Sequence, residues 1–193
     1  SNAVYANLEA NLTEKLSGGI AGRYENYSDA GATRSGKLSA RYAFTDTFSL
    51  RGTISNGFRA PSLAQQNYAS VVTLIQNGEL VQVGTYRTSD PVALALGARP
   101  LSPEKSSNYG LGGVWQPTAN FTSSLDVYQI RIWDQILYSD QLQLAQPIGQ
   151  VAAVQFFVNG ATSRTRGVDW VNSYIADLGE LGQLTLGASA NYN

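Results

Sequence analysis

The stretch FSLRGTISNGF (residues 48–58) decides the fold class, because its side chains alternate between two kinds. Apolar or small residues take every second position, namely Phe48, Leu50, Gly52 and Ile54. Polar residues take the positions between them, namely Ser49, Arg51, Thr53 and Ser55. A period of two indicates a β-strand with one apolar face and one wet face.

The same alternation recurs in seven further segments of the chain. They are residues 4–12, 18–27, 36–44, 108–116, 121–137, 165–175 and 183–192. No segment shows a convincing amphipathic helix. The sequence therefore predicts an all-β chain of about eight strands.

The segment 121–137 changes its pattern part of the way along. Its apolar residues begin on one parity, with Leu125 and Val127, and continue on the other, with Ile130 and Ile132. This change indicates either a β-bulge or the point where the strand leaves the environment that buries its first half.

The connections between these segments alternate in length. Short connections are expected at residues 13–16, 45–47, 117–120 and 177–182, and longer ones at 28–34, 59–104 and 139–163. In an antiparallel up-and-down meander, this alternation places the short turns at one end and the long loops at the other. Outer-membrane barrels sort their connections in this way, whereas soluble β-sandwiches usually do not.

Aromatic residues gather beside two of the short turns. Phe44 and Phe48 flank one turn, and Trp115 and Phe121 flank another. Such rings are typical of the interface between hydrocarbon and water. Cross-strand packing in a soluble protein would explain the rings alone. Together with the sorted loops, they favour a strand set that belongs to a transmembrane β-barrel.

Composition excludes several classes of function. The chain has 193 residues, no histidine and no cysteine, so it cannot supply a thiol nucleophile, a histidine base or a Cys/His zinc site. The net charge of -1 gives no basic field for nucleic acid. We expect no catalytic residue, no metal site and no cofactor. Residues 1–3, Ser-Asn-Ala, are expected to be a cloning scar.

Four segments, in order, carry a family resemblance. They are LRGTISNGFRAPSL (50–63), LSPEKSSNYGLGGVWQP (101–117), FTSSLDVYQIRIWDQI (121–136) and NGATSRTRGVDW (159–170). Each is similar to a strand or loop entry of the TonB-dependent outer-membrane receptors. Asp169 stands where that family commonly has glutamate.

The resemblance implies that residues 4–193 form part of a barrel of about 22 strands, without its plug domain. It implies the outer membrane of a Gram-negative bacterium, with lipid, the plug and TonB as partners. The implied function is energised uptake of a scarce nutrient, either a siderophore–metal chelate, cobalamin or a carbohydrate. The long extracellular loops would help to capture this small-molecule ligand.

Two sets of site residues follow as expectations. Arg51, Arg59, Arg41 and Arg23 are candidates for lumen contacts with the plug, with simple solvation of the rim as the alternative. Gln76, Asn77, Tyr86 and Arg87 are candidates for ligand contacts in the longest loop, because their side chains can hydrogen-bond a sugar or a siderophore.

Part of a larger barrel would expose raw strand edges and a lipid face. The isolated piece is therefore expected to self-associate. The alternative from another class is a self-contained small barrel or soluble β-domain that acts as a binding or adhesion module. An enzyme is the reading that the residues support least.

Overall fold

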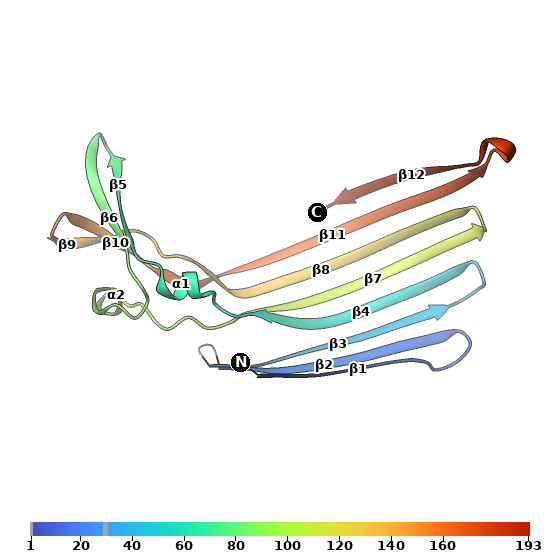
Figure 1. Cartoon of the computed structure of the whole chain (residues 1–193), viewed down its shortest axis with the longest axis horizontal. Coiled ribbons are helices and arrows are strands. Elements are labelled where there is room, and N and C mark those ends of the chain that lie inside the picture. The colour runs from blue at the N-terminus through green and yellow to red at the C-terminus, as the bar shows by residue number, and fades with distance from the viewer. Residues whose placement is uncertain (1, 29–30) are drawn as a thin grey trace.

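The computed structural model describes residues 2–28 and 31–193, which form two β-sheets (Figure 1). The larger one, called the wall sheet below, is antiparallel throughout and open, with β1 and β12 at its two edges. Its strands in spatial order are β1 (Asn2–Asn11), β2 (Leu16–Tyr27), β3 (Gly31–Ala43), β4 (Phe48–Arg59), β7 (Glu104–Thr118), β8 (Phe121–Tyr138), β11 (Phe157–Asp177) and β12 (Gln183–Tyr192). The predicted antiparallel meander of eight strands is confirmed.

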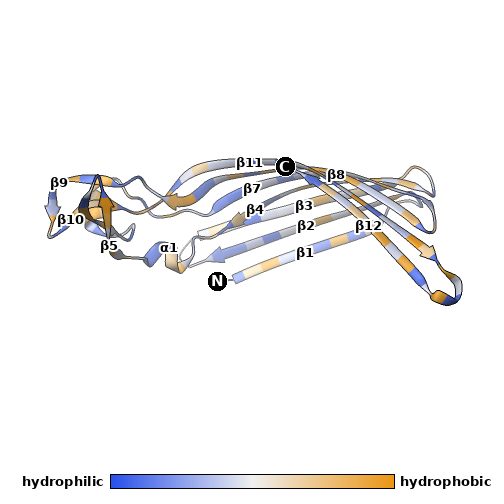
Figure 2. Cartoon of the chain, turned by 90° about the horizontal axis from the view of Figure 1, so that it is seen from above, coloured by the Kyte–Doolittle hydropathy of each residue, from blue (hydrophilic) through white to orange (hydrophobic). Residues whose placement is uncertain are grey.

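The register of the wall sheet aligns the alternating residues of all its strands. Leu8, Ile20, Leu38 and Ile54, for example, are successive partners across four strands. The sheet therefore has one apolar face and one polar face, and Figure 2 shows apolar and polar residues alternating along its strands. Residues of the apolar face stay open, since Leu8 is 67% and Leu38 is 55% exposed. The wall sheet thus has no hydrophobic core of its own.

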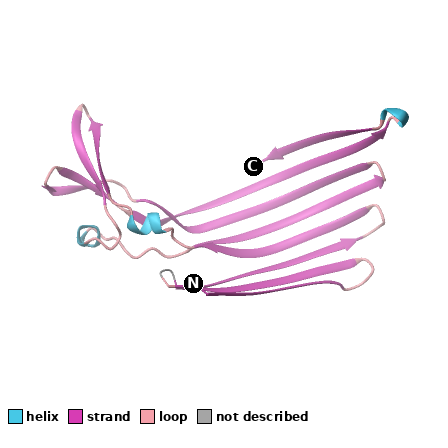
Figure 3. Ribbon diagram, viewed as in Figure 1, coloured by secondary structure: helices cyan, strands magenta, loops and turns pink. Residues whose placement is uncertain are grey.

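A second sheet, called the loop sheet below, corrects the prediction of strands. Residues 59–104 and 139–163 were expected to be loops, but each contributes two strands to it. The strand order is β5 (Ser70–Gln76), β6 (Glu79–Thr85), β10 (Val151–Gln155) and β9 (Leu142–Ile148). Figure 3 shows strands in this part of the molecule as well as in the wall sheet. The described residues therefore contain twelve strands, namely the eight of the predicted meander and four more in the segments that were expected to be loops.

The β5–β6 hairpin forms because of its turn residues. Asn77 and Gly78 both have positive φ angles, 51° and 85°, which match a two-residue hairpin turn. Valine in both segments and isoleucine in β5 favour strands. The pairing of β6 with β10 is parallel, and it joins two segments that are far apart in the sequence.

The loop sheet holds the main hydrophobic core. Ala93, Ala98, Val151, Val154 and Phe156 are buried together. Two short helices, α1 (Leu63–Asn67) and α2 (Pro91–Ala95), accompany the sheet, and a 3₁₀ turn, η1 (Gly179–Leu181), connects β11 to β12. Within residues 2–28 and 31–193, no helix has the length and apolar character needed to cross a membrane.

One connection differs from the prediction. The strands β2 and β3 leave only residues 28–30 between them, where 28–34 was expected, and residues 29 and 30 lie outside the described part. Backbone pairing extends past the apolar positions, because it needs no apolar side chain. The four other short turns all lie at the end of the wall sheet opposite the loop sheet (Figure 1).

The two explanations for the parity change in 121–137 can be told apart by register. Pairing of β8 with β7 and with β11 is continuous between Val127 and Ile130, so no bulge lies there. A shift with β11 occurs further along, between Ile132 and Gln135, where Asp134 has a φ of 57°. Ile130 and Ile132 therefore lie on the polar face.

Candidate functional site

A row of residues crosses the polar face of the wall sheet, one from each strand. In spatial order it consists of Asn11, Ser17, Arg41, Arg51, Gly112, Asp126, Asp169 and Asn191. The cations come from β3 and β4, and the carboxylates come from β8 and β11. The row is therefore positive on one side and negative on the other.

Arg51 and Asp126 join the two sides of this row. Arg51 Nη2 donates to both carboxylate oxygens of Asp126, at 3.0 and 2.8 Å, and Nε donates to Oδ1 at 3.1 Å. Strand β7 runs between them, and its residue at this level is Gly112. A Cβ atom at Gly112 would overlap the carboxylate, so glycine is what lets the two side chains meet.

Arg41 lies directly opposite Arg51 and has no carboxylate ion pair within the described residues. Two like charges at facing positions of a sheet repel each other. Both arginines, together with Glu9, line a hollow of about 540 Å³ on the polar face. The positive side of the row therefore contains a cation, Arg41, that has no carboxylate ion pair among the described residues.

Arg59 sits at the loop end of β4, outside the apolar band. Its Nη2 and Nε donate to the two oxygens of Glu104, at 2.6 and 2.8 Å. The buried Glu104 also accepts the backbone N–H of Ile136 at 2.8 Å. Burial alone would raise the pKa of the Glu104 carboxyl, but the Arg59 and Ile136 hydrogen bonds outweigh it and hold that pKa below its ordinary value.

Arg23 pairs within its own strand. Its Nη2 lies 2.5 Å from Oε1 of Glu25, a buried carboxylate that also accepts the Tyr27 hydroxyl at 3.3 Å. Three of the four predicted arginines are therefore ion-paired to carboxylates of the wall sheet. Arg41 and Arg51 share one level of the sheet, while Arg23 and Arg59 lie at others.

The four predicted ligand contacts divide into two places. Tyr86 and Arg87 follow β6 and line a pocket of about 560 Å³, together with Ser70, Thr85 and Asp90. Gln76 and Asn77 lie at the hairpin turn, the opposite end of β5 and β6 from Ser70 and Thr85. The Gln76 amide donates to Gln141 at 2.8 Å, which joins the two long segments. The pocket therefore includes Tyr86 and Arg87 but not Gln76 and Asn77.

Sequence reasoning missed the carboxylates Asp126 and Glu104 as partners of the arginines. Asp126 is 75 residues from Arg51, and Glu104 is 45 residues from Arg59. Only the register of the sheet brings them together. In the described part of the chain, no three His, Cys, Asp or Glu side chains gather to hold a metal ion.

Comparison with protein-family models identifies one family. A family model described as "TonB dependent receptor-like, beta-barrel" matches residues 1–193. A search of curated protein sequences found no match.

Solved structures share the fold at low sequence identity. The siderophore receptor PirA from Pseudomonas aeruginosa is 17% identical, with a TM-score of 0.72 over 98% of this chain and 34% of that one. The ferric enterobactin receptor PfeA from Pseudomonas aeruginosa, a mutant in complex with enterobactin, is 16% identical, with a TM-score of 0.76 over 99% of this chain and 26% of that one. The haemophore receptor HasR of Serratia marcescens is 13% identical, with a TM-score of 0.68 over 99% and 33%. This chain thus spans about a third or less of the length of these receptors.

Proposed function

Because this chain belongs to the TonB-dependent receptor-like β-barrel family, we propose that it forms part of the wall and outer loops of a nutrient receptor. Residues 4–193 would supply eight strands of a larger barrel in the outer membrane of a Gram-negative bacterium. A plug domain elsewhere in the protein would fill the lumen, and TonB would provide the energy for uptake.

One observation supports the proposed role in ligand capture. Two segments far apart in the sequence, 59–104 and 139–163, fold into one sheet at the end opposite the four short turns. This sheet has its own core and a pocket lined by Tyr86 and Arg87. A packed loop region with polar groups around a pocket suits the capture of a small molecule from outside the cell.

We propose an iron chelate, either a siderophore complex or haem, ahead of cobalamin or a carbohydrate. The solved structures that share the fold include a siderophore receptor, a ferric enterobactin receptor with enterobactin, and a haemophore receptor with its haemophore and haem. Arg87 gives the pocket an exposed cation, which would attract an anionic chelate.

The polar face would meet the plug in this proposal. Arg41 and the hollow beside it are the strongest candidates for plug contact, because Arg51, Arg59 and Arg23 already pair with carboxylates of the sheet. The open sheet, with β1 and β12 unpaired to each other, counts against the alternative of a self-contained small barrel.

Uptake by whole cells tests the function. A strain in which the intact gene is deleted would be compared with its parent and with the complemented deletion strain. The measured quantity is the uptake of labelled ferric enterobactin, haem, cobalamin and maltodextrin. We expect uptake of an iron chelate that stops when TonB is deleted. Uptake that continues without TonB, or equal uptake of every compound in the deletion strain and its parent, would contradict the proposal.

A further inference from the structure

We propose that the free edge of β5 pairs with a further strand, supplied by the outer loop that follows β12 in the intact receptor. The added strand would extend the loop sheet from four strands to five. The inference rests on the proposed function, because it requires the larger barrel. It concerns how the outer loops are held together and not which nutrient is transported.

The sequence of β5 is typical of a strand that has neighbours on all sides. Its central residues, VVTLI (71–75), form an almost continuous apolar run without charge, proline or glycine. Such a run is typical of a strand buried on both faces, whereas a strand open on one face alternates apolar and polar residues. In the loop sheet, however, β5 is an edge strand that pairs with β6 alone among the described residues. Its sequence therefore fits a central strand, while its position is at an edge.

The side chains of β5 are open on both faces of the loop sheet. On one face Ile75 is 75% exposed, and its partner Leu80 on β6 is 76% exposed. On the other face Val72 and Leu74 are exposed as well. Apolar side chains that gather on a surface commonly mark a contact site. The hairpin therefore presents apolar surface that another segment can bury.

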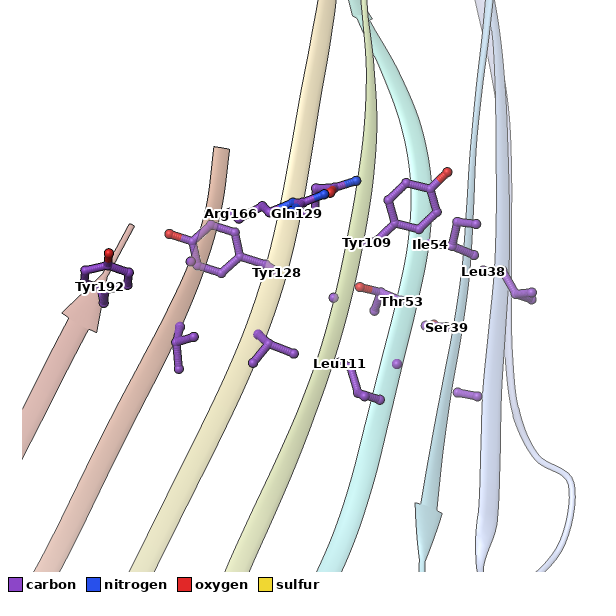
Figure 4. A pocket seen from close by; sticks show the side chains of 16 residues that line it. Leu38, Ser39, Thr53, Ile54, Tyr109, Leu111, Tyr128, Gln129, Arg166 and Tyr192 are labelled. Carbon is purple, nitrogen blue, oxygen red and sulfur yellow. The ribbon is translucent and has the colours of Figure 1, made fainter. Parts of the chain in front are cut away.

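The apolar surface of β5 differs in its place from that of the wall sheet. On the wall sheet, Leu38, Ile54 and Leu111 line an apolar groove of about 760 Å³ (Figure 4). In the proposed function, the hydrocarbon of the membrane covers that face. The loop sheet lies at the end of the wall sheet that the proposed function places outside the membrane, where the connections face water. The cover of β5 is therefore expected to be protein and not lipid.

The backbone of β5 offers hydrogen bonds along the same edge. A two-residue turn joins β5 to β6, so Gln76, just before the turn, belongs to a hydrogen-bonded pair, and the bonded positions alternate from there. The N–H and C=O groups of Val71, Thr73 and Ile75 consequently point away from β6. In the part of the chain that the structure describes, no strand pairs with this side of β5. An incoming strand would thus find donors and acceptors already in register.

The opposite edge of the loop sheet is protected against such pairing. Strand β9 carries Pro147, which has no N–H to donate. Proline and charged residues are means by which proteins keep edge strands from pairing, and β5 has neither. The chain therefore blocks one edge of this sheet and leaves the other able to pair.

The wall sheet indicates which segment can reach β5. Strand β11 has 21 residues, but β12 pairs only with Val168–Asp177. The outer part of β11, residues 157–167, is therefore open on the side of β12 among the described residues. In the larger barrel, the strand that begins with β12 would continue along this part. It would then arrive beside Phe157, which a single residue separates from β10 of the loop sheet.

Two further observations favour the next outer loop as the partner of β5. In Figure 1 the β5–β6 hairpin rises toward the side of the wall sheet on which β12 lies, away from β1. This chain also spans about a third or less of the receptors that share its fold, so other outer loops of such a receptor lie outside it. Because β5 carries no charge, the strand that fits it is an uncharged and largely apolar one.

A photocrosslink in the intact receptor identifies the partner. Ile75→p-benzoylphenylalanine would be introduced and irradiated in outer membranes isolated from cells, and mass spectrometry would map the product. We expect a crosslink within one receptor, from β5 to the outer loop that follows the strand begun by β12. Ile148→p-benzoylphenylalanine, on the protected edge strand β9, is the matched control and should not crosslink to that loop.

Proline substitution tests whether the contact is a backbone pairing. Thr73→Pro removes one outward N–H and leaves the bonds to β6 in place, as proline can on an edge strand. Because one hydrogen bond contributes a factor of about five, Thr73→Pro should lower the crosslink yield about fivefold. It should also speed hydrogen exchange at Val71 and Ile75. Thr73→Val keeps the N–H and should change neither quantity.

The inference is overturned if Ile75 crosslinks to the plug, to a second copy or to another protein, or if it gives no product. It is also overturned if Thr73→Pro crosslinks as the wild type does, or if the control at Ile148 reaches the same loop with equal yield. Nutrient uptake is measured in parallel. Uptake without the crosslink would overturn only this inference, whereas absence of uptake in the wild type would overturn the proposed function instead.

Discussion

Arg51 and Asp126 form a forked ion pair across an intervening strand, at a position where that strand has a glycine and therefore no side chain in the way. The pair links β4 to β8 over Gly112 of β7. Three strands are thereby tied together on the polar face, in addition to their backbone hydrogen bonds.

Gly112→Ala should break this pair, because the added Cβ overlaps the carboxylate. Gly22→Ala is the control, since a Cβ at Gly22 would meet nothing within 4 Å. We expect Gly112→Ala to lower the free energy of unfolding by about 1 kcal/mol more than the control does. Urea unfolding of the intact receptor in detergent measures both, and equal effects would show that the pair adds nothing.

Glu104→Ala should loosen the junction between the wall sheet and the loop sheet. It leaves the buried N–H of Ile136 without its acceptor and Arg59 without its carboxylate, at a cost of about 1–3 kcal/mol. Hydrogen exchange at residues 134–138 should become faster. Glu104→Gln keeps an oxygen for Ile136 and should have a smaller effect, so identical exchange in both variants would contradict this account.

Asn77 is a predicted ligand contact that also forms a turn with positive φ. Asn77→Gly keeps the turn and removes the amide, whereas Asn77→Val disfavours the turn itself. Limited proteolysis of the β5–β6 hairpin should increase only for the valine variant. If Asn77→Gly weakens binding of a transported chelate without altering proteolysis, the amide contacts the ligand.

A disulfide should join the two long segments. Thr85 of β6 and Gln155 of β10 are direct cross-strand partners, and the chain has no native cysteine to interfere. Thr85→Cys with Gln155→Cys should oxidise, as measured by loss of free thiols. Thr85→Cys with Lys15→Cys is the control and should stay reduced, because Lys15 lies in the turn between β1 and β2, at the end of the wall sheet opposite the loop sheet (Figure 1).

The isolated chain should self-associate in buffer without detergent. Its edge strands β1 and β12 offer unpaired backbone groups, and its apolar face is exposed. Analytical ultracentrifugation should show dimers or larger species that detergent disperses. A monodisperse monomer in plain buffer would contradict the lipid-facing assignment.

The wall sheet could be predicted from sequence because its signal is local. A period of two in residues 48–58 fixes which side chains share a face, and the short turns fix which strands are neighbours. The β5–β6 hairpin has a local signal, the Asn77-Gly78 pair with strand-forming residues on both sides, although the expectation for this segment was a ligand-binding loop. The β6–β10 pairing and the Arg51–Asp126 pair had no local signal, because each depends on the register of segments far apart in the chain.

The link between the two sheets has a mechanical consequence. A single residue, Phe156, separates β10 from β11, and it is buried in the core of the loop sheet. Its N–H is also held by the Ser139 hydroxyl at 3.1 Å. Because only Phe156 separates the two strands, a tilt of the loop sheet would displace the end of β11 directly. Motion of the loop sheet would then be transmitted to the wall sheet through β11.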